Sequence, residues 1–182
     1  MGMFLKDINL KGKTALITGA TKGLGRGAAI AIAEAGGNII AIGRNQTELN
    51  SLKKEIKRFR VNYTPFNCDV NNYNRMKSFI SRLKKLDILV NNAGTNIPEP
   101  FLNVKNNSME TLLNVNTKAV FNVAQLCAKQ IIKLKRKSGS IINVSSIFGL
   151  VAGQKRSVYS MTKFSVEGLT KGMALDLAKY NI

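Results

Sequence analysis

The sequence predicts an α/β protein built on a doubly wound parallel sheet of the Rossmann type, because short apolar runs alternate with longer amphipathic stretches. The expected strands are continuous apolar runs, such as KTALIT at residues 13–18. Runs without polar alternation are typical of a parallel sheet that is covered on both faces. No linker, repeat or low-complexity segment interrupts the pattern, so we expect residues 1–182 to form one domain.

Each element can be placed from its own pattern. Alanine-rich spacing predicts the first helix, which Gly36 and Gly37 end. Leu49, Leu52 and Ile56 give the second helix an apolar face at helical spacing. The expected strands are residues 13–18, 38–42, 61–67, 87–91 and 140–144, and the expected helices are residues 23–35, 46–59, 73–83, 106–135 and 159–180.

Composition excludes several kinds of site. The chain has no histidine, which excludes Ser-His-Asp and Cys-His catalysis and zinc sites that need histidine. Its two cysteines, Cys68 and Cys127, are too few for a four-thiolate metal site or a disulfide framework, so we expect buried thiols and no metal. No apolar run approaches the ~20 residues of a membrane helix. We therefore expect a cytoplasmic protein with reduced thiols and no membrane partner.

The net charge of +18, from 28 basic and 10 acidic residues, raises the question of a nucleic-acid partner. The basic residues are scattered, and the chain is rich in Lys, Asn and Ile together, which indicates a compositional bias. Aromatic residues that could stack on bases are not interleaved with the basic ones. We expect no nucleic-acid partner.

A glycine-rich turn, TGATKGLG at residues 18–25, joins the first strand to the first helix. Glycines let the backbone approach a pyrophosphate, and the helix N-terminus offers free N–H groups there. The spacing is Gly-x3-Gly-x-Gly, and a tight strand-to-helix connection without a ligand is the alternative interpretation. The residues expected to contact the cofactor here are Gly19, Thr21, Lys22, Gly23, Leu24 and Gly25.

The end of the second strand bears on the choice of cofactor. An NAD enzyme places Asp or Glu there for the ribose 2′-hydroxyl, but this chain reads Gly43-Arg44-Asn45. The Arg44 guanidinium could bind a 2′-phosphate through two hydrogen bonds, and Lys22 could reach the same group. Two cations without a carboxylate predict NADP rather than NAD, unless both simply belong to the general excess of basic residues.

Further motifs follow in order along essentially the whole chain. They are Cys68-Asp69-Val70, Asn91-Asn92-Ala93-Gly94, Asn116, Ser146 and Tyr159-x3-Lys163. Together with the glycine turn, this ordered set resembles the short-chain dehydrogenase/reductase family. The resemblance implies strand order 3-2-1-4-5. The Tyr-x3-Lys pair alone says little in a chain this rich in lysine, whereas Asn-Asn-Ala-Gly after a strand is far more specific.

Tyr159 and Lys163 make chemical sense as a pair. Reduction of a carbonyl needs a proton donor, and an unperturbed tyrosine, with a pKa of about 10, is a poor one near neutral pH. A lysine at i+4 lies on the same helix face. An ammonium at ~4 Å stabilises a phenolate by roughly 4 kcal/mol at an effective dielectric constant near 20. The pair can therefore supply the acid/base function in a chain without imidazole.

The resemblance assigns further roles. Tyr159 is the implied general acid/base and Ser146 the implied hydrogen-bond donor to the substrate oxygen. Lys163 would also hold the nicotinamide ribose, and Asn116 would fix a water that relays protons to Lys163. Ser145 could instead be the active serine, although the spacing to Tyr159 favours Ser146. By default Asn116 would be a surface residue in a chain this rich in asparagine.

The resemblance also assigns cofactor contacts. Asp69 and Val70 would contact the adenine, although Asp69 could be a plain turn residue. Asn92, Ala93 and Gly94 would line the cofactor cleft, and Asn92 would also brace the sheet.

The expected activity is NADP-dependent interconversion of a ketone and a secondary alcohol. A 3-oxoacyl-carrier-protein reductase and a sugar or polyol (gluconate-type) dehydrogenase both fit. A catalytically silent NAD(P)-sensing regulator on the same fold is the alternative. By resemblance, residues 106–135 and 159–180 would form the surfaces of a homodimer or homotetramer.

The family continues beyond the point where residue 182 ends this chain. We therefore expect a domain that is incomplete at its C-terminus, with its last strand as an uncovered edge. The 182-residue chain alone is expected to be poorly stable and inactive.

Overall fold

The computed structural model describes residues 8–136 and 138–182. Its centre is a five-stranded sheet in which every neighbouring pair of strands is parallel. The strands are β1 (Thr14–Thr18), β2 (Asn38–Gly43), β3 (Tyr63–Asn67), β4 (Ile88–Asn91) and β5 (Ser140–Asn143). Their order is β3-β2-β1-β4-β5, which confirms the order predicted from the sequence.

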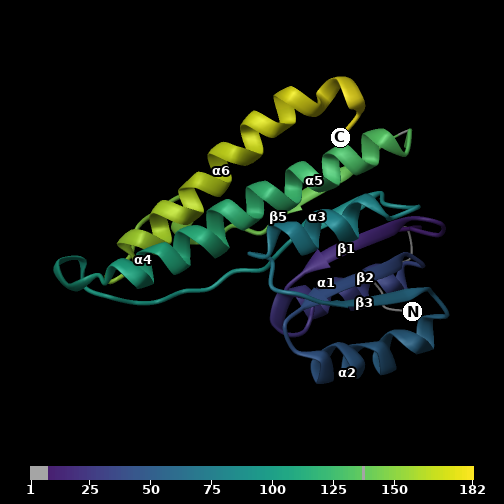
Figure 1. The fold of residues 1–182 in the computed structure, drawn as a ribbon, viewed down its shortest axis with the longest axis horizontal. Helices are drawn as coiled ribbons and strands as arrows, with labels where there is room; N and C mark the ends of the chain where they lie inside the picture. Colours follow the sequence, from purple (N-terminus) through teal and green to yellow (C-terminus); the bar gives the residue numbers. More distant parts are fainter. Residues whose placement is uncertain (1–7, 137) are drawn as a thin grey trace.

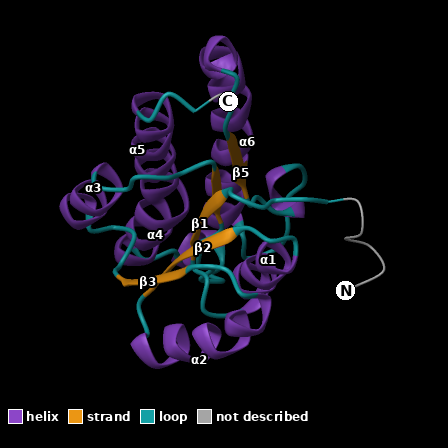
Figure 2. Cartoon of the chain, turned by 90° about the vertical axis from the view of Figure 1, so that its right-hand side faces the viewer, coloured by secondary structure: helices purple, strands orange, loops and turns teal. Residues whose placement is uncertain are grey.

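Helices cover both faces of the sheet, as a doubly wound fold requires (Figures 1 and 2). One core packs α1 and α2 against the sheet, and the other packs α3 and α5 against the opposite face. The helices are α1 (Gly23–Glu34), α2 (Gln46–Ile56), α3 (Tyr73–Ser81), α4 (Asn106–Leu113), α5 (Ala119–Lys133) and α6 (Ser157–Leu177).

The central strand shows why the apolar runs are continuous. Leu16 points into the core beneath α3 and α5, whereas Ala15 and Ile17 point into the core beneath α1 and α2. All five residues of β1 are buried. A strand with two covered faces has no position left for an exposed polar side chain.

The predicted elements are present, but several boundaries differ. The second helix ends at Ile56, and a 3₁₀ turn (Lys57–Phe59) leads to Arg60 in the left-handed conformation, with φ +57°. The helix expected over residues 106–135 is helical only to Lys133, and a π-helical turn (Asn114–Lys118) separates α4 from α5. The last helix begins at Ser157 rather than residue 159.

The sheet is open at β5, which is its last strand. The exposure of β5 alternates along its length, and Ile142 is 49% exposed. Beyond α6 the chain turns back, and the N–H of Gly139 donates to the carbonyl oxygen of Asn181 at 2.9 Å. Within the described residues, β5 is therefore an edge strand of the sheet.

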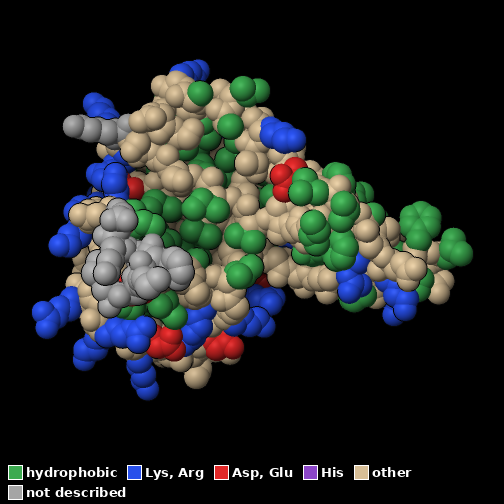
Figure 3. Space-filling model, turned by 180° about the vertical axis from the view of Figure 1, so that it is seen from behind, with side chains coloured by type: hydrophobic (Ala, Val, Ile, Leu, Met, Phe, Trp, Pro, Cys, Tyr) green, Lys and Arg blue, Asp and Glu red, His purple; other side chains and the backbone are tan. Residues whose placement is uncertain are grey.

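The surface carries scattered basic side chains and one projecting apolar end (Figure 3). A 3₁₀ turn (Phe101–Asn103) before α4 exposes Phe101 to 78% and Leu102 to 92%. None of the described helices combines the length and the apolar character needed to cross a bilayer. Within residues 8–136 and 138–182, no three His, Cys, Asp or Glu side chains gather where they could hold a metal ion.

Candidate functional site

The glycine turn after β1 is tied to the segment after β4. Thr18 Oγ1 accepts hydrogen bonds from the backbone N–H groups of Asn92 and Ala93, both at 3.0 Å. In return, Asn92 Nδ2 donates to the carbonyl oxygens of Thr18 at 3.0 Å and Gly19 at 3.2 Å. A Cβ atom at Gly25 would collide with the Gly19 carbonyl oxygen and the Asn92 amide. Only glycine therefore lets α1 begin this close to the turn.

A groove of about 450 Å³ opens at the carboxyl end of the sheet, where open α/β sheets bind ligands. Four of the predicted cofactor residues, Gly23, Gly25, Tyr159 and Lys163, do not line it. Gly23 turns the chain with φ +54°, and Gly25 is buried beneath the turn. The predicted cofactor residues that line the groove are Gly19, Thr21, Lys22, Leu24, Arg44, Asp69, Val70, Asn92, Ala93 and Gly94.

Two cations predicted to bind a 2′-phosphate stand at this groove. Lys22 and Arg44 are both exposed and both line it. Arg44 Nη1 lies 3.8 Å from Asp69 Oδ2, and the Arg44 side chain is 79% exposed. Exposed ion pairs of this kind contribute little free energy, so Asp69 does not hold the guanidinium away from a phosphate.

The groove extends to Gly94, which borders two buried polar side chains. A Cβ atom at Gly94 would lie 3.4 Å from Asn116 Oδ1 and 3.8 Å from Lys163 Nζ. Asn116 lies in the π-helical turn and is completely buried, so it is not a surface residue. Its Oδ1 accepts from the N–H of Thr95, and its Nδ2 donates to the Thr95 carbonyl, both at 2.8 Å. The carboxamide thus joins the segment after β4 to the helix.

Lys163 is 6% exposed and extends from α6 toward the end of β5. Its Nζ donates to the carbonyl oxygen of Val144 at 2.9 Å and lies 5.8 Å from the centroid of the Tyr159 ring. Burial lowers the pKa of Lys163 from its ordinary value. The ammonium and the phenol therefore share one face of α6, and the ammonium lies beside Gly94 in the groove wall.

The two candidate serines have different contacts. Ser145 Oγ donates to the carbonyl oxygen of Lys163 at 3.4 Å, beneath α6. Ser146 Oγ accepts from the N–H of Phe148 at 3.2 Å. The Phe148 ring meets the Tyr159 ring edge-on, with centroids 6.2 Å apart. Ser146 is thus linked to Tyr159 through Phe148, whereas Ser145 packs against helix backbone.

Both cysteines are buried, as predicted. Burial raises the pKa of the Cys127 thiol and is also the main cause that raises the pKa of the Cys68 thiol. Cys68 lines the groove, and its thiol donates to the Asp69 carbonyl at 3.2 Å. Neutral buried thiols act as small apolar groups, so Cys68 supplies wall surface rather than a nucleophile.

Sequence reasoning missed part of the groove wall. Thr95 and Val115 directly neighbour the motif residues Gly94 and Asn116, and that adjacency was the available signal. Cys68 and Gly43 stand in quoted motifs without having been assigned to the groove, and Ile42 and Thr111 contribute shape, which no motif records. The unpredicted lining residues are Ile42, Gly43, Cys68, Thr95, Thr111 and Val115.

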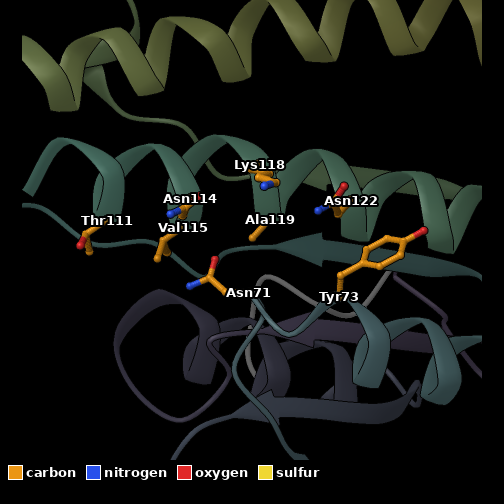
Figure 4. A pocket seen from close by; sticks show the side chains of 8 residues that line it. All are labelled: Asn71, Tyr73, Thr111, Asn114, Val115, Lys118, Ala119 and Asn122. Carbon is orange, nitrogen blue, oxygen red and sulfur yellow. The ribbon is translucent and has the colours of Figure 1, made fainter. Parts of the chain in front are cut away.

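A second cavity, of about 370 Å³, adjoins the groove and shares Thr111 and Val115 with it. Figure 4 shows Asn71 and Tyr73 facing the helical wall that carries the remaining lining residues. Carboxamides and hydroxyls dominate this cavity. It extends the groove past the segment after β3.

Comparison with known proteins agrees with this geometry. A family model described as short chain dehydrogenase matches residues 13–182. L-xylulose reductase of Mus musculus is 36% identical over 176 residues, which cover 97% of this chain and 70% of the relative. 3-oxoacyl-[acyl-carrier-protein] reductase FabG of Thermotoga maritima is 34% identical over 179 residues, which cover 96% of this chain and 72% of the relative.

Solved structures give the same result. A putative 2-deoxy-D-gluconate 3-dehydrogenase of Agrobacterium tumefaciens with bound NADP superposes with a TM-score of 0.90 at 29% identity, covering 97% of this chain and 70% of that one. Structures that resemble this chain include complexes with NAD as well as with NADP. The family model spans nearly the whole chain, and the relatives are named dehydrogenases and reductases. The chain therefore belongs to the short-chain dehydrogenase/reductase family of oxidoreductases.

Proposed function

We propose that this protein uses NADP(H) to interconvert a ketone and a secondary alcohol. One observation carries the proposal: the groove that begins at the glycine turn extends to Gly94, and both Asn116 Oδ1 and Lys163 Nζ lie close to Gly94. A dinucleotide with its phosphates at the glycine turn would have its other end beside Lys163 and Tyr159. The Lys163 ammonium thus lies beside Gly94, at one end of the groove, although Lys163 and Tyr159 do not line it.

The residues present fit a dinucleotide phosphate. Gly19 and Gly94 line the groove and carry no Cβ atom. Between Gly19 and Thr21, the Ala20 side chain is fully buried and does not line the groove. Lys22 and Arg44 offer cations to a 2′-phosphate, and Gly43-Arg44-Asn45 offers no carboxylate to a ribose 2′-hydroxyl. These features support NADP over NAD.

When bound, the nicotinamide supplies or accepts the hydride at the carbonyl carbon. In our proposal the Tyr159 hydroxyl donates the proton that the developing alkoxide needs, and takes it back in the reverse direction. The Lys163 ammonium stabilises the phenolate that is left. Lys163 Nζ already donates to the Val144 carbonyl, which fixes its position on that side of α6.

Ser146 and Asn116 complete the proposed site. Ser146 follows β5 and accepts a hydrogen bond from the N–H of Phe148, whose ring contacts Tyr159. In our proposal Ser146 donates its hydroxyl to the substrate oxygen. The Asn116 carboxamide is engaged on both its oxygen and its nitrogen with Thr95, so its first role is to shape the site. In the proposal its π-helical turn also presents backbone through which a water could relay protons to Lys163.

The substrate class is left to two candidates that the relatives support. One relative is named for a keto sugar and another for a 3-oxoacyl group on a carrier protein. Both substrates present a ketone that becomes a secondary alcohol, so the same acid/base groups serve both.

The proposal also includes a homo-oligomer formed through the last two long helices. Phe121 on α5 is 46% exposed, and Phe164 on α6 is 49% exposed. A second copy that covered both rings would bury apolar surface now in contact with water. Light scattering on a sizing column tests this, and a monomer at all concentrations would contradict it.

The central test separates binding from turnover. The 182-residue chain should bind NADPH more tightly than NADH, measured by the change in nicotinamide fluorescence. In any form of the protein that turns over ketones, Tyr159→Phe should reduce that turnover by about 10²- to 10⁴-fold while NADPH binding persists. Ketose, keto-acid and acyl-thioester panels identify the substrate. NADPH binding without turnover of any ketone would favour a cofactor-sensing regulator instead.

A further inference from the structure

Arg26, on the first turns of α1, makes a cluster of contacts that neither the family motifs nor the proposed mechanism uses. Its Nη1 donates to the carbonyl oxygen of Thr21 at 3.0 Å. Its Nη2 donates to Ser51 Oγ at 3.0 Å and to Glu55 Oε1 at 2.6 Å. The Arg26 side chain is only 22% exposed. One guanidinium thus ties the glycine turn to the middle of α2.

The contact at Thr21 controls the glycine turn. Thr21 is buried, and its Cγ2 lies so close to Gly43 that a Cβ there would collide with it. The N–H of Ala20 also donates to the carbonyl oxygen of Ile42 at 3.0 Å. Arg26 therefore donates to the carbonyl of Thr21, whose side chain packs closely against the end of β2.

The contacts at Ser51 and Glu55 control the neighbouring helix. The α2 helix starts directly after Arg44, where the Asn45 side chain accepts a hydrogen bond from the N–H of Glu48 at 3.1 Å. A shift of α2 along its axis would move Arg44 with it. Arg26 binds Ser51 and Glu55, which lie one and two turns farther along α2, and so fixes where that helix begins.

Lys22 follows Thr21 in the chain, and Arg44 follows Gly43. The two cations at the groove are therefore the chain neighbours of Thr21 and Gly43, the two residues whose contact Arg26 stabilises. We propose that Arg26, held by Glu55, is a positioning residue that sets the spacing of Lys22 and Arg44 and so the preference for a 2′-phosphate. This inference rests on the proposed preference for NADP.

A purely electrostatic role for the same residues makes an opposite prediction. Removing the positive charge of Arg26 would weaken phosphate binding, but removing the negative charge of Glu55 would strengthen it. If Arg26 acts by position, both changes loosen the link between the glycine turn and α2, because Arg26→Met removes all the guanidinium contacts and Glu55→Gln removes the ion pair that holds the guanidinium at α2. Both must then weaken discrimination in favour of the 2′-phosphate.

The test measures dissociation constants of 2′,5′-ADP and 5′-AMP by calorimetry, for the unmodified chain and for Arg26→Met, Glu55→Gln and Ser51→Ala. The unmodified chain should prefer 2′,5′-ADP. Arg26→Met and Glu55→Gln should each lower that preference by about tenfold, and Ser51→Ala should lower it by a smaller factor. Arg58→Met, which removes an exposed arginine stacked on Phe59, should leave the preference unchanged.

The ratio of the two dissociation constants separates a change in preference from a loss of folding. Partial unfolding weakens the apparent binding of both nucleotides by the same factor and so leaves the ratio unchanged. Ser51→Ala removes one hydrogen bond to Arg26 without changing the charge. If Arg26→Met does not fold, the nucleotide preference of Ser51→Ala still tests the inference. A tighter 2′,5′-ADP complex in Glu55→Gln, or an unchanged ratio in both charge variants, would overturn the inference while leaving the NADP proposal intact. Equal affinity of the unmodified chain for both nucleotides would overturn both.

Discussion

The sheet has a closed part and an open part, and the candidate site lies where they meet. All five residues of β1 are buried, and the turn after it is tied by hydrogen bonds to the segment after β4. β5 alternates between exposed and half-buried positions. In our proposal the difference separates two tasks: the closed part holds the groove that binds the cofactor, and the open part lies toward the substrate.

The same contrast divides α6. Its buried residues are all in the first half and include Lys163 and Val166. From residue 167 to residue 177, every position of the helix is exposed or half-buried. The half that carries Tyr159 and Lys163 is thus anchored by packing. Substitutions in the distal half should leave the positions of these two side chains unchanged.

The largest expected effect comes from adding one methyl group in the closed part. Gly25→Ala places a Cβ against the Gly19 carbonyl and the Asn92 amide, which cannot both yield. We expect a loss of about 3 kcal/mol in unfolding free energy, at the upper end of overpacking effects, and weakened NADPH binding. Urea unfolding and a fluorescence titration measure the two quantities.

The matched control is Gly172→Ala, because nothing lies within 4 Å of a Cβ at that position of α6. If Gly25→Ala proved no more damaging than this control, the tight approach of α1 to the glycine turn would be wrong.

A second comparison removes one hydroxyl from each part. Thr18→Val keeps the shape of the side chain but leaves the N–H groups of Asn92 and Ala93 without their acceptor. We expect a cost of about 2 kcal/mol in unfolding free energy. Thr170→Val removes a hydroxyl that bonds to Asn143 at the exposed edge and should cost about 0.5 kcal/mol or less. Equal costs would remove the distinction between the closed and open parts.

A third prediction concerns pH. Burial lowers the pKa of Lys163 in the folded state, so the unfolded chain binds more protons between that lowered pKa and the ordinary value of 10.5. Stability contributed by this residue therefore rises with pH through that window. In Lys163→Met, the increase in unfolding free energy with pH that this residue contributes should be absent.

Denaturant unfolding of both proteins from pH 7 to pH 10 gives the difference. The unmodified protein should gain stability relative to Lys163→Met as pH increases. Parallel curves over the whole range would mean that Lys163 is not desolvated in the folded chain.

The smallest expected effect is a gain. Gly168→Ala and Gly172→Ala replace glycines inside α6 at sites where a Cβ meets nothing within 4 Å. Alanine in a helix interior is favoured over glycine by roughly 0.5–1 kcal/mol, so each variant should unfold at a slightly higher urea concentration. A clear loss of stability in either would show that the distal half of α6 is packed more tightly than described.

Much of the fold could be predicted because it depends on local pattern. Continuous apolar runs such as the one around Leu16 predicted the strands. The glycine turn and Asn92 predicted the end of the sheet at which the groove opens. The π-helical turn at Asn116 could not be predicted, because the apolar spacing continues across it and the hydrogen bonds from Thr95 come from another part of the chain.

The site was predicted where a residue carries chemistry and missed where it carries shape or support. Tyr159 and Lys163 were predicted as an acid/base pair from the family resemblance and from the lack of histidine, and their catalytic roles stay a prediction. Cys68 and Thr111 line the groove through packing alone, which no spacing rule records. The contact of Arg26 with Glu55 joins helices far apart in sequence, so it becomes visible only once α1 and α2 lie side by side.

Hydrogen–deuterium exchange of the chain with and without NADPH tests the central claim, that one groove from the glycine turn to Gly94 binds the cofactor. We expect slowed exchange in residues 18–25 and 92–95 on binding, and unchanged exchange in residues 167–177. Protection confined to other segments, or none at saturating NADPH, would contradict the assignment of the groove.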